Sequence, residues 1–402
     1  MCIRDRSIID QQGDSILPMT LINTAIRTKE PIVINNATEI NPFSSDPYIK
    51  NNKPLSVMCV PLPMHGKWPS AVYLENNLTH SAFTEERVKV IKLLASQASI
   101  SMENARIYEE QEKLLIAQQR FIPIQFLKHL GHNDIVKVEL GESVSMEMSV
   151  LFSDIKNFTP LVEKLTPQAV IELLNRYYSN LSAPISTSGG FIDSYAGDGI
   201  MALFAVPAQK AVEAGIGMFH SLMEFNHNLD LNGQPIIAAG IGINTGPLVL
   251  GTIGANDRMQ CSVLGDTVNL ASRIEQLTRA YDAPFLIGEN TYLSLARPDA
   301  FSIRMIDCVA VKGKAVAVKL YEVLDVENKE RRAAKEATRD LLNEALDAYF
   351  ARNFSKASKI LSKALIIDPV DIVLTTFSSR CKHYMEKTPP EDWKGFEKLT
   401  QK

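Results

Sequence analysis

Two aspartates at the ends of strand-like segments are the residues best suited to chemistry in this sequence. Asp154 follows the apolar run Val150–Phe152, which is typical of a buried strand, and a helix start predicted just after it offers N–H groups to phosphate oxygens. Asp198 lies between two glycines and two strand-like segments, which predicts the tight turn of a β-hairpin. Each feature alone is ordinary, because aspartates often cap helices and occupy turns. If the two carboxylates converge, they can hold two divalent cations about 3.5 to 4 Å apart for phosphoryl chemistry.

A second group of residues has the chemistry of phosphate binding. Asn269 and Arg273 are four residues apart, so on a helix they share one face and can reach the same ligand. The planar guanidinium group of arginine matches the oxygens of a phosphate. Lys312, in a turn-like segment, adds a positive charge of low specificity. The glycines between residues 240 and 254 do not have the spacing of a dinucleotide-binding or P-loop fingerprint.

The elements that must position these residues begin with an α+β segment and a long helix. Strand-like stretches recur between about residue 15 and residue 77, and a helix is predicted to start near Phe83, with Thr84 as its cap. Within this helix an apolar residue recurs every seven positions, namely Leu93, Ile100, Ile107, Leu114 and Phe121. The intervening core positions are polar, namely Gln97, Asn104, Gln111 and Gln118. This repeat predicts a parallel two-stranded seam ended by Pro123, whereas packing of the same face on its own domain fits only the first half of the helix.

The C-terminal region has the pattern of a helical hairpin. Residues 329–335 are a charged link, and small and large apolar residues alternate from Ala348 to Pro369 in the manner of a tetratricopeptide repeat. One such repeat cannot bury its own apolar face, so it must lie on the preceding domain, on another chain or on a protein partner. We expect packing on the preceding domain of the same chain.

Composition excludes several classes of protein. The chain has 402 residues, enough for two or three domains, and a formal net charge of −4 that provides no basic footprint for nucleic acid. Its five cysteines are scattered and never spaced as CxxC, which favours a reducing cytoplasm over a disulfide framework or a zinc site. No apolar run reaches the roughly 20 residues that span a bilayer. The opening Met1–Ser7 is typical of artefacts at the ends of assembled reading frames, so we expect a truncated N-terminus. The missing upstream part could even include a membrane segment.

Five motifs closely resemble, in this order, the class III adenylate and guanylate cyclase domain: SVLFSDIKNFTPLVEKL, GGFIDSYAGDGIMALF, AAGIGINTGPLVLGTIG, SVLGDTVNLASRIEQLT and VKGKAVAVKLYEVL. The resemblance covers about residues 140–325 and implies an α+β, ferredoxin-like domain that dimerises head to tail, with active sites at the interface. Residues 1–105 resemble a GAF domain, mainly in their second half, which implies a sensor of an unknown small ligand or of redox state; retention for dimerisation alone is the alternative. Residues 106–139 then form a helical connector and residues 326–402 an α-helical tail.

The resemblance also assigns roles to single residues. Asp154, Asp198 and the backbone carbonyl of Ile155 match the ligands of two Mg²⁺ or Mn²⁺ ions. Substrate contacts are implied for Asn157, Phe158, Thr159 and Lys312, of which the lysine matches the one that binds the terminal phosphates. From a second copy of the chain, Asn269 and Arg273 match the pair that positions the ribose and stabilises the transition state. The products would be a 3′,5′-cyclic nucleotide and pyrophosphate.

Two positions depart from the family pattern. Four residues before the second metal-binding aspartate, adenylate cyclases usually have lysine and guanylate cyclases glutamate, whereas this chain has Ser194. The second purine-reading position is Ser262. Because the glutamate that would demand GTP is missing, we expect a homodimeric adenylate cyclase that takes ATP, with relaxed selectivity toward GTP. The alternative is a catalytically silent scaffold that presents its C-terminal helices to a protein partner. A diguanylate cyclase is disfavoured, since no Gly-Gly-Asp-Glu-Phe signature occurs.

Overall fold

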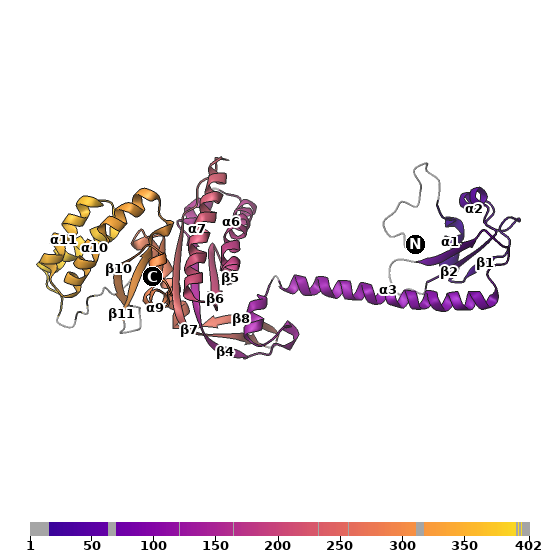
Figure 1. Cartoon of the computed structure of the whole chain (residues 1–402), viewed down its shortest axis with the longest axis horizontal. Helices are drawn as coiled ribbons and strands as arrows, with labels where there is room; N and C mark the ends of the chain where they lie inside the picture. The colour runs from indigo at the N-terminus through magenta and orange to yellow at the C-terminus, as the bar shows by residue number, and fades with distance from the viewer. Residues whose placement is uncertain are drawn as a thin grey trace. The chain divides into compact units, whose positions relative to one another are not determined.

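The computed structural model describes residues 16–62, 70–119, 121–163, 165–231, 233–255, 257–310 and 317–390, together with Trp393 and Gly395. The chain divides into two compact units, Met1–Arg120 and Phe121–Lys402, and each is described by itself (Figure 1). Among the described residues, no helix is both long enough and apolar enough to cross a lipid bilayer.

The N-terminal unit is a small antiparallel sheet with helices on both faces. In chain order its elements are α1 (Met19–Thr28), β1 (Ile32–Ile34), α2 (Pro47–Asn52), β2 (Ser56–Pro61), β3 (Ala71–Asn76) and α3 (Glu85–Gln119). The strands pair in the order β1-β2-β3. Side chains alternate along β2, so Val57 and Cys59 share a core with α1 and α2, whereas Met58 and Val60 share a core with α3.

Helix α3 buries one face on its own unit and exposes another. Ala95, which packs on the sheet, and Ser99 are buried. Leu93 and Ile100, which belong to the seven-residue repeat, are 64% and 53% exposed. The repeat face is therefore distinct from the face that packs on the unit, even in the first half of the helix. The helix ends at Gln119, so Phe121, the expected last position of the repeat, lies beyond it.

The second unit is built on a long mixed sheet. Its strands are β4 (Ser143–Ile155), β5 (Phe191–Ala196), β6 (Gly199–Phe204), β7 (Ala239–Ala255), β8 (Arg258–Leu264), β9 (Phe285–Gly288), β10 (Ile303–Ala310) and β11 (Ala317–Val323). They lie in the order β10-β11-β9-β7-β4-β6-β5, with β8 paired to β7. The β7–β9 pair is parallel and the other pairs are antiparallel.

Helices cover both faces of this sheet. Leu151 of β4 points into a core with α6 (Pro167–Thr187) and α7 (Ala208–Leu231). The preceding residue, Val150, points to the opposite face, where it meets α4 (Ile124–His129) and α8 (Asp266–Ala280). The shorter elements are η1 (Ile135–Lys137), α5 (Phe158–Val162), α9 (Glu289–Leu293), η2 (Pro298–Ala300) and η3 (Leu324–Val326). The expected α+β layout is confirmed.

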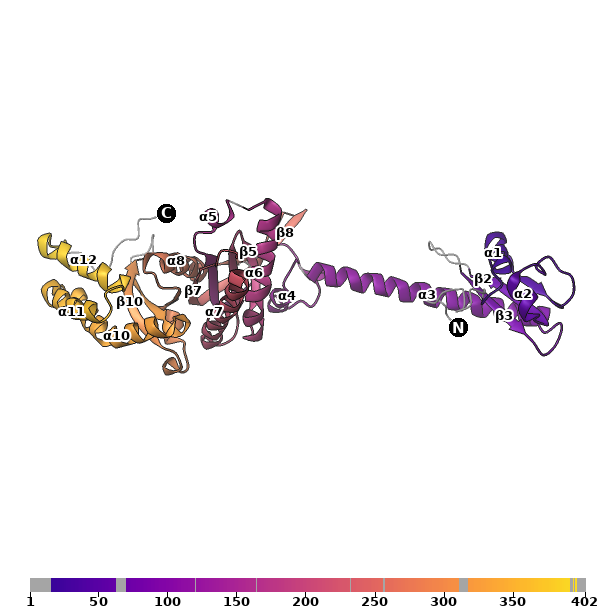
Figure 2. The same ribbon diagram turned by 90° about the horizontal axis from the view of Figure 1, so that it is seen from above.

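Three C-terminal helices pack on the sheet in cis. They are α10 (Lys329–Phe350), α11 (Phe354–Ile367) and α12 (Ile372–Glu386), visible beside β10 in Figure 2. Tyr349 and Phe377 from these helices share one buried core with Leu286 of β9 and Leu320 of β11. The predicted hairpin corresponds to α10 and α11, and its expected packing on the preceding domain is confirmed.

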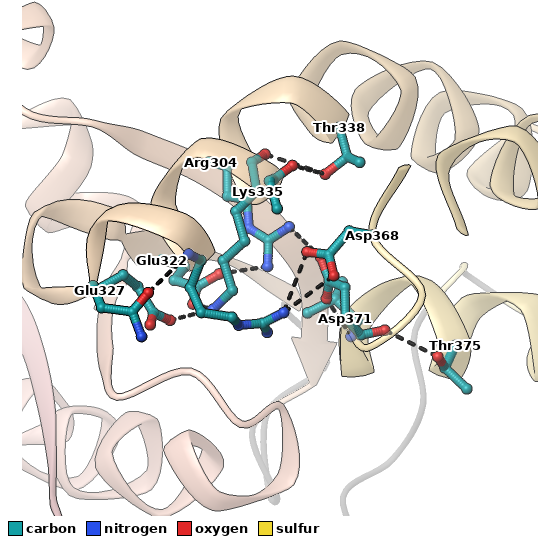
Figure 3. A network of polar contacts seen from close by, with 12 residues as sticks. Arg304, Glu322, Glu327, Lys335, Thr338, Asp368, Asp371 and Thr375 are labelled. Carbon is teal, nitrogen blue, oxygen red and sulfur yellow. Dashed lines mark hydrogen bonds and ion pairs between the residues drawn. The ribbon is translucent and has the colours of Figure 1, made fainter. Parts of the chain in front are cut away.

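A buried ionic network joins the sheet to the C-terminal helices (Figure 3). Arg304 of β10 donates to Glu322 of β11 at 2.7 Å and to Asp371, which caps α12, at 2.5 Å. Lys335 of α10 donates to the other oxygen of Glu322 at 2.6 Å. These four side chains are at most 2% exposed. Because each charge is buried together with its partners, loss of any one of them leaves an uncompensated charge in the interior.

Candidate active site

Asp154 and Asp198 come together at one end of the second unit's sheet. Asp154 is the penultimate residue of β4, and Asp198 lies in the tight turn between β5 and β6, so the predicted hairpin is confirmed. Ser153 pairs with Ile200, which places this turn beside the end of β4. Burial, the charge of Asp154 and a hydrogen bond between the two carboxyl groups raise the pKa of Asp198 to about 6. A Cβ at Gly199, the residue after Asp198, would lie 3.6 Å from Oδ1 of Asp154, so the turn brings the two carboxylates close together.

Helix α6 supports the turn that carries Asp198. Gly197 has a φ of +66°, a conformation that residues with a Cβ rarely adopt. The hydroxyl of Tyr178, on α6, donates to the carbonyl of Gly197 at 2.5 Å. The ring centroids of Tyr178 and of Tyr195 on β5 are also 4.3 Å apart. These contacts fix the turn relative to the body of the domain.

Arg279 of α8 binds both expected metal ligands at the end of β4. Its Nη2 donates to Oδ2 of Asp154 at 2.5 Å and to the backbone carbonyl of Ile155 at 3.4 Å. The carboxylate and carbonyl oxygens therefore converge on a single positive charge. The sequence did not single out Arg279, although an arginine near the end of a helix is a detectable signal.

Glu275 adds a third carboxylate close to this site. It lies one turn before Arg279 on α8, is 6% exposed, and its Oε1 has no hydrogen-bond partner among the described residues. Burial and then the charge of Asp154 raise the pKa of Glu275 to about 7. Its spacing of four residues from Arg279 is readable in the sequence and indicates a shared helix face.

Gly240 allows α8 to approach the metal-binding end of the sheet. It pairs with Asp154 across the β4–β7 ladder. A Cβ at this position would lie 2.2 Å from Oγ1 of Thr278 and 3.2 Å from Oε1 of Glu275. The glycines of the GIGINTG segment thus serve close helix packing, not a phosphate loop.

Helix α5 begins where the sequence predicted a helix start. Asn157 precedes it in the left-handed region, with a φ of +55°, and its side chain makes no capping hydrogen bond to the helix. Phe158 and Thr159 form the first turn. These residues are four and five positions after Asp154, so N–H groups of a helix start follow this carboxylate closely in the chain.

Asn269 and Arg273 lie in the N-terminal half of α8, whereas Arg279, which binds Asp154, lies near its C-terminal end. Asn269 is exposed and Arg273 is half-buried. Asn269 precedes Arg279 by ten residues, which corresponds to about 15 Å along the helix axis. The structure therefore brings Asp154 and Asp198 together but does not bring Asn269 to them within one chain.

The two expected base-reading serines come from neighbouring parts of the same unit. Ser194 on β5 is exposed and Ser262 on β8 is half-buried. Asp193 lies at a bulge of β5; burial raises its pKa, partly opposed by a hydrogen bond with Ser194. Burial and then the charge of Asp193 raise the pKa of the Cys261 thiol to about 11, so β5 and β8 approach each other here. Asp193 was not predicted, because a bulge leaves no clear mark in the sequence.

Lys312 lies outside the described residues. The strands on either side of it, β10 and β11, are described and form an antiparallel pair from Ile303–Val323 to Ala310–Ala317.

The donor set at the end of β4 fits a hard divalent cation. It offers two carboxylates and one backbone carbonyl, all oxygen ligands of the kind Mg²⁺ and Mn²⁺ prefer. Within the part of the chain that the structure describes, no group of three or more His, Cys, Asp or Glu side chains forms a metal-binding cluster. Besides being buried, Glu275 lies close enough to the pair for the charges of Asp154 and Asp198 to raise its pKa.

Family models match two parts of the chain. The adenylate and guanylate cyclase catalytic domain matches residues 142–324. The GAF domain matches residues 4–102.

Several characterised proteins are similar to the chain. An adenylate cyclase of Anabaena cylindrica is 37% identical over 254 residues, which cover 61% of this chain and 51% of that protein. The terminal-differentiation specific adenylate cyclase of Dictyostelium discoideum is 36% identical over 270 residues, 65% of this chain and 12% of that protein. The chain thus spans about half or less of these relatives. The crystal structure of the adenylyl cyclase CyaB from P. aeruginosa is 33% identical, with a TM-score of 0.41 over 45% of this chain and 95% of that one.

Proposed function

Residues 142–324 belong to the adenylate and guanylate cyclase catalytic-domain family and residues 4–102 to the GAF family, and from this premise we propose that the chain is an adenylate cyclase. It converts ATP to 3′,5′-cyclic AMP and pyrophosphate at a site shared by two copies of the chain. The observation that carries the proposal is the approach of Asp154 and Asp198 at the end of β4, where oxygen ligands converge on a positive charge.

The reaction joins the ribose 3′ oxygen to the α-phosphorus. The bond from that phosphorus to the oxygen shared with the β-phosphate breaks, and the hydroxyl proton is released. Asn269 of a second copy orients the ribose, and its Arg273 balances the charge that develops on the α-phosphate. Lys312 of that copy and the first turn of α5, at Asn157, Phe158 and Thr159, bind phosphate oxygens.

Asp154, Asp198 and the carbonyl of Ile155 hold two Mg²⁺ or Mn²⁺ ions in this proposal. Such ions supply two things when bound: they acidify the 3′-hydroxyl and neutralise phosphate charge. Support comes from the oxygen donor set and from the guanidinium of Arg279, which these same oxygens bind.

ATP is the preferred nucleotide in this proposal, and GTP is a weaker substrate. Ser194 and Ser262 have hydroxyl groups that both donate and accept, so neither side chain discriminates strongly between purine edges. The similarity to several adenylate cyclases supports ATP.

Dimerisation through α3 and through the catalytic unit completes the site. The exposed face of Leu93, Ile100, Ile107 and Leu114 supports a parallel two-stranded seam, because a monomer would leave these side chains in water. A small ligand bound by the GAF domain would act through this helix. The C-terminal helices remain a candidate surface for a protein partner.

The test is direct detection of cyclic product by mass spectrometry. The purified full-length chain is incubated with ATP or GTP, each with Mg²⁺ and with Mn²⁺. We expect cyclic AMP in excess over cyclic GMP, and no product of either kind from Asp154→Ala or Asp198→Ala. Glu224→Ala, which removes an exposed carboxylate of α7, is the matched control and should keep full activity.

Two outcomes would contradict the proposal. Product formation by Asp154→Ala would show that the metal assignment is incorrect. Absence of product from the unmodified chain under all four conditions would favour the catalytically silent scaffold.

A further inference from the structure

The C-terminal helices are packed against the part of α8 that carries Asn269 and Arg273. Leu270 and Ile274 follow these two residues directly, and both belong to the apolar core that α8 shares with α10, α11 and α12. Ile306 of β10 also belongs to that core. Among the described residues, the core includes none from β4, β5 or β6, the strands that position Asp154 and Asp198. The tail therefore packs along α8, which carries Asn269 and Arg273 and also Arg279, and not on the strands that position Asp154 and Asp198.

A second polar cluster ties α12 to α8 and β10 at a single carboxylate. Arg380 of α12 donates to Oδ2 of Asp307 at 2.8 Å. Tyr281, the residue after α8, donates its hydroxyl to the same carboxylate. Asp307 and Tyr281 are buried, and Asp307 lies at a bulge of β10, five positions before Lys312. Asp307 thus fixes the C-terminal end of α8 relative to β10 and α12.

The ionic network of Arg304 attaches the tail to the same pair of strands, three residues before Asp307 along β10 (Figure 3). Arg304 and Glu322 face each other across β10 and β11, and both are held from the tail by Asp371 and Lys335. Two separate buried clusters therefore attach the tail to β10 and β11, and one of them includes α8.

We infer that α10–α12 are a positioning element for the half of the active site that α8 supplies through Asn269 and Arg273, and that Asp307, Tyr281 and Arg380 are its positioning residues. The inference rests on the proposed function, in which this half-site serves the metal-binding half of a second copy. A group that must meet a transition state is effective only when its support is rigid, and a displacement of about 1 Å can cost up to 100-fold in rate.

The test compares Arg380→Ala in each of the two chains of a mixed dimer that has one intact active site. Full-length Asp154→Ala chains are co-assembled with full-length Arg273→Ala chains, so that one intact site remains per mixed dimer. Arg380→Ala is then added either to the chain that supplies Arg273 or to the chain that supplies Asp154. We expect kcat to fall about ten-fold or more in the first arrangement and less than about two-fold in the second.

Controls separate positioning from folding. Arg380→Lys keeps the ion pair and should restore most of the activity, and Tyr281→Phe, which removes only one hydroxyl, should reproduce the asymmetry more weakly. Lys356→Ala, which removes an exposed ion pair within the tail, should have no effect in either chain. Melting temperatures of all variants are measured in parallel.

Equal losses in the two arrangements would overturn the inference, since a general loss of stability affects both chains alike. No loss in either arrangement would also overturn it. Failure of the starting pair to make any product would instead count against the proposed function, because that pair tests only the shared site.

Discussion

At the scale of single residues, Asp154 binds a cation that belongs to the protein itself. The guanidinium of Arg279 contacts Asp154 and Ile155, and it also interacts with Asp198 and Glu275. Three carboxylates close together repel one another, and one arginine offsets part of that repulsion. A divalent cation must therefore compete with Arg279 for the oxygens of Asp154.

Arg279→Ala should bind Mn²⁺ more tightly in the absence of nucleotide. The ion pair is partly exposed, with 41% and 29% exposure for its two side chains, so the gain should be at most about five-fold in affinity. Electron paramagnetic resonance of free Mn²⁺ measures this directly. Lys210→Ala, which removes a distant exposed charge, is the control. Unchanged or weaker binding would mean that Arg279 does not compete with the metal.

Ser194→Lys should sharpen the choice of ATP over GTP. An ammonium group only donates hydrogen bonds, so it suits the acceptor N1 of adenine and not the N–H at the same position of guanine. One charge-assisted hydrogen bond corresponds to a change of about ten-fold in the ratio of kcat/KM values. Steady-state kinetics with both nucleotides provides the ratio. If that ratio stays constant, Ser194 does not contact the base.

Residue types and spacing predicted the carboxylate pair but not its surroundings. Asp154 and Asp198 could be identified because each ends a strand or forms a turn, which are features of local sequence. Arg279 and Asp154 are 125 positions apart in the sequence, so their contact could not be assigned without the fold. Glu275 belongs to the site because its carboxylate is buried there, which the sequence alone does not show. Asp193 is placed by a bulge, for which the sequence has no reliable signal.

At the scale of elements, helix α3 has an exposed apolar face that a dimer would cover. Ile107→Asp should weaken dimerisation and lower activity at low protein concentration, because two carboxylates would face each other in the seam. Analytical ultracentrifugation together with activity at several concentrations measures both effects. Glu109→Ala, on the opposite side of the helix, should leave dimerisation unchanged. A dimer as stable as that of the parent chain would rule out the seam.

The ionic network between the sheet and the tail should dominate the stability of the second unit. Arg304→Ala leaves Glu322 and Asp371 buried without their main partner. The free energy of unfolding should fall by about 3–5 kcal/mol, which corresponds to a loss of about 10 °C in melting temperature. Differential scanning calorimetry is the measurement. Lys356→Ala should shift the transition by less than about 2 °C. A small shift for Arg304→Ala would show that the network is dispensable.

Elements were more predictable than their packing. The helix near Thr84, the hairpin at Asp198 and the C-terminal helical hairpin all follow from periodicity and capping signals. Local sequence does not specify that Arg304 and Asp371, 67 positions apart, would be buried against each other. Helix α3 ends at Gln119, four residues before Pro123, which the sequence predicted as the end of the repeat, because a proline sets only the latest point at which a helix can end.

At the scale of the whole molecule, the chain combines a GAF domain with a cyclase domain, and in the proposed dimer each copy supplies half of each of two active sites. Asp154 and Asp198 lie near the end of β4, whereas Asn269 and Arg273 lie on α8, so in this proposal neither set is sufficient alone. The proposed activity therefore depends on complementation between two copies of the chain related by a two-fold axis.

Mixing two inactive variants tests this dependence most directly. Asp154→Ala and Arg273→Ala chains, each inactive alone, are co-expressed in equal amounts and the rate of cyclic AMP formation is measured. Random assembly makes about half of the dimers mixed, each with one intact site, so we predict about one quarter of the parent activity. No activity in the mixture, with mixed dimers shown to be present, would contradict a site shared between two copies.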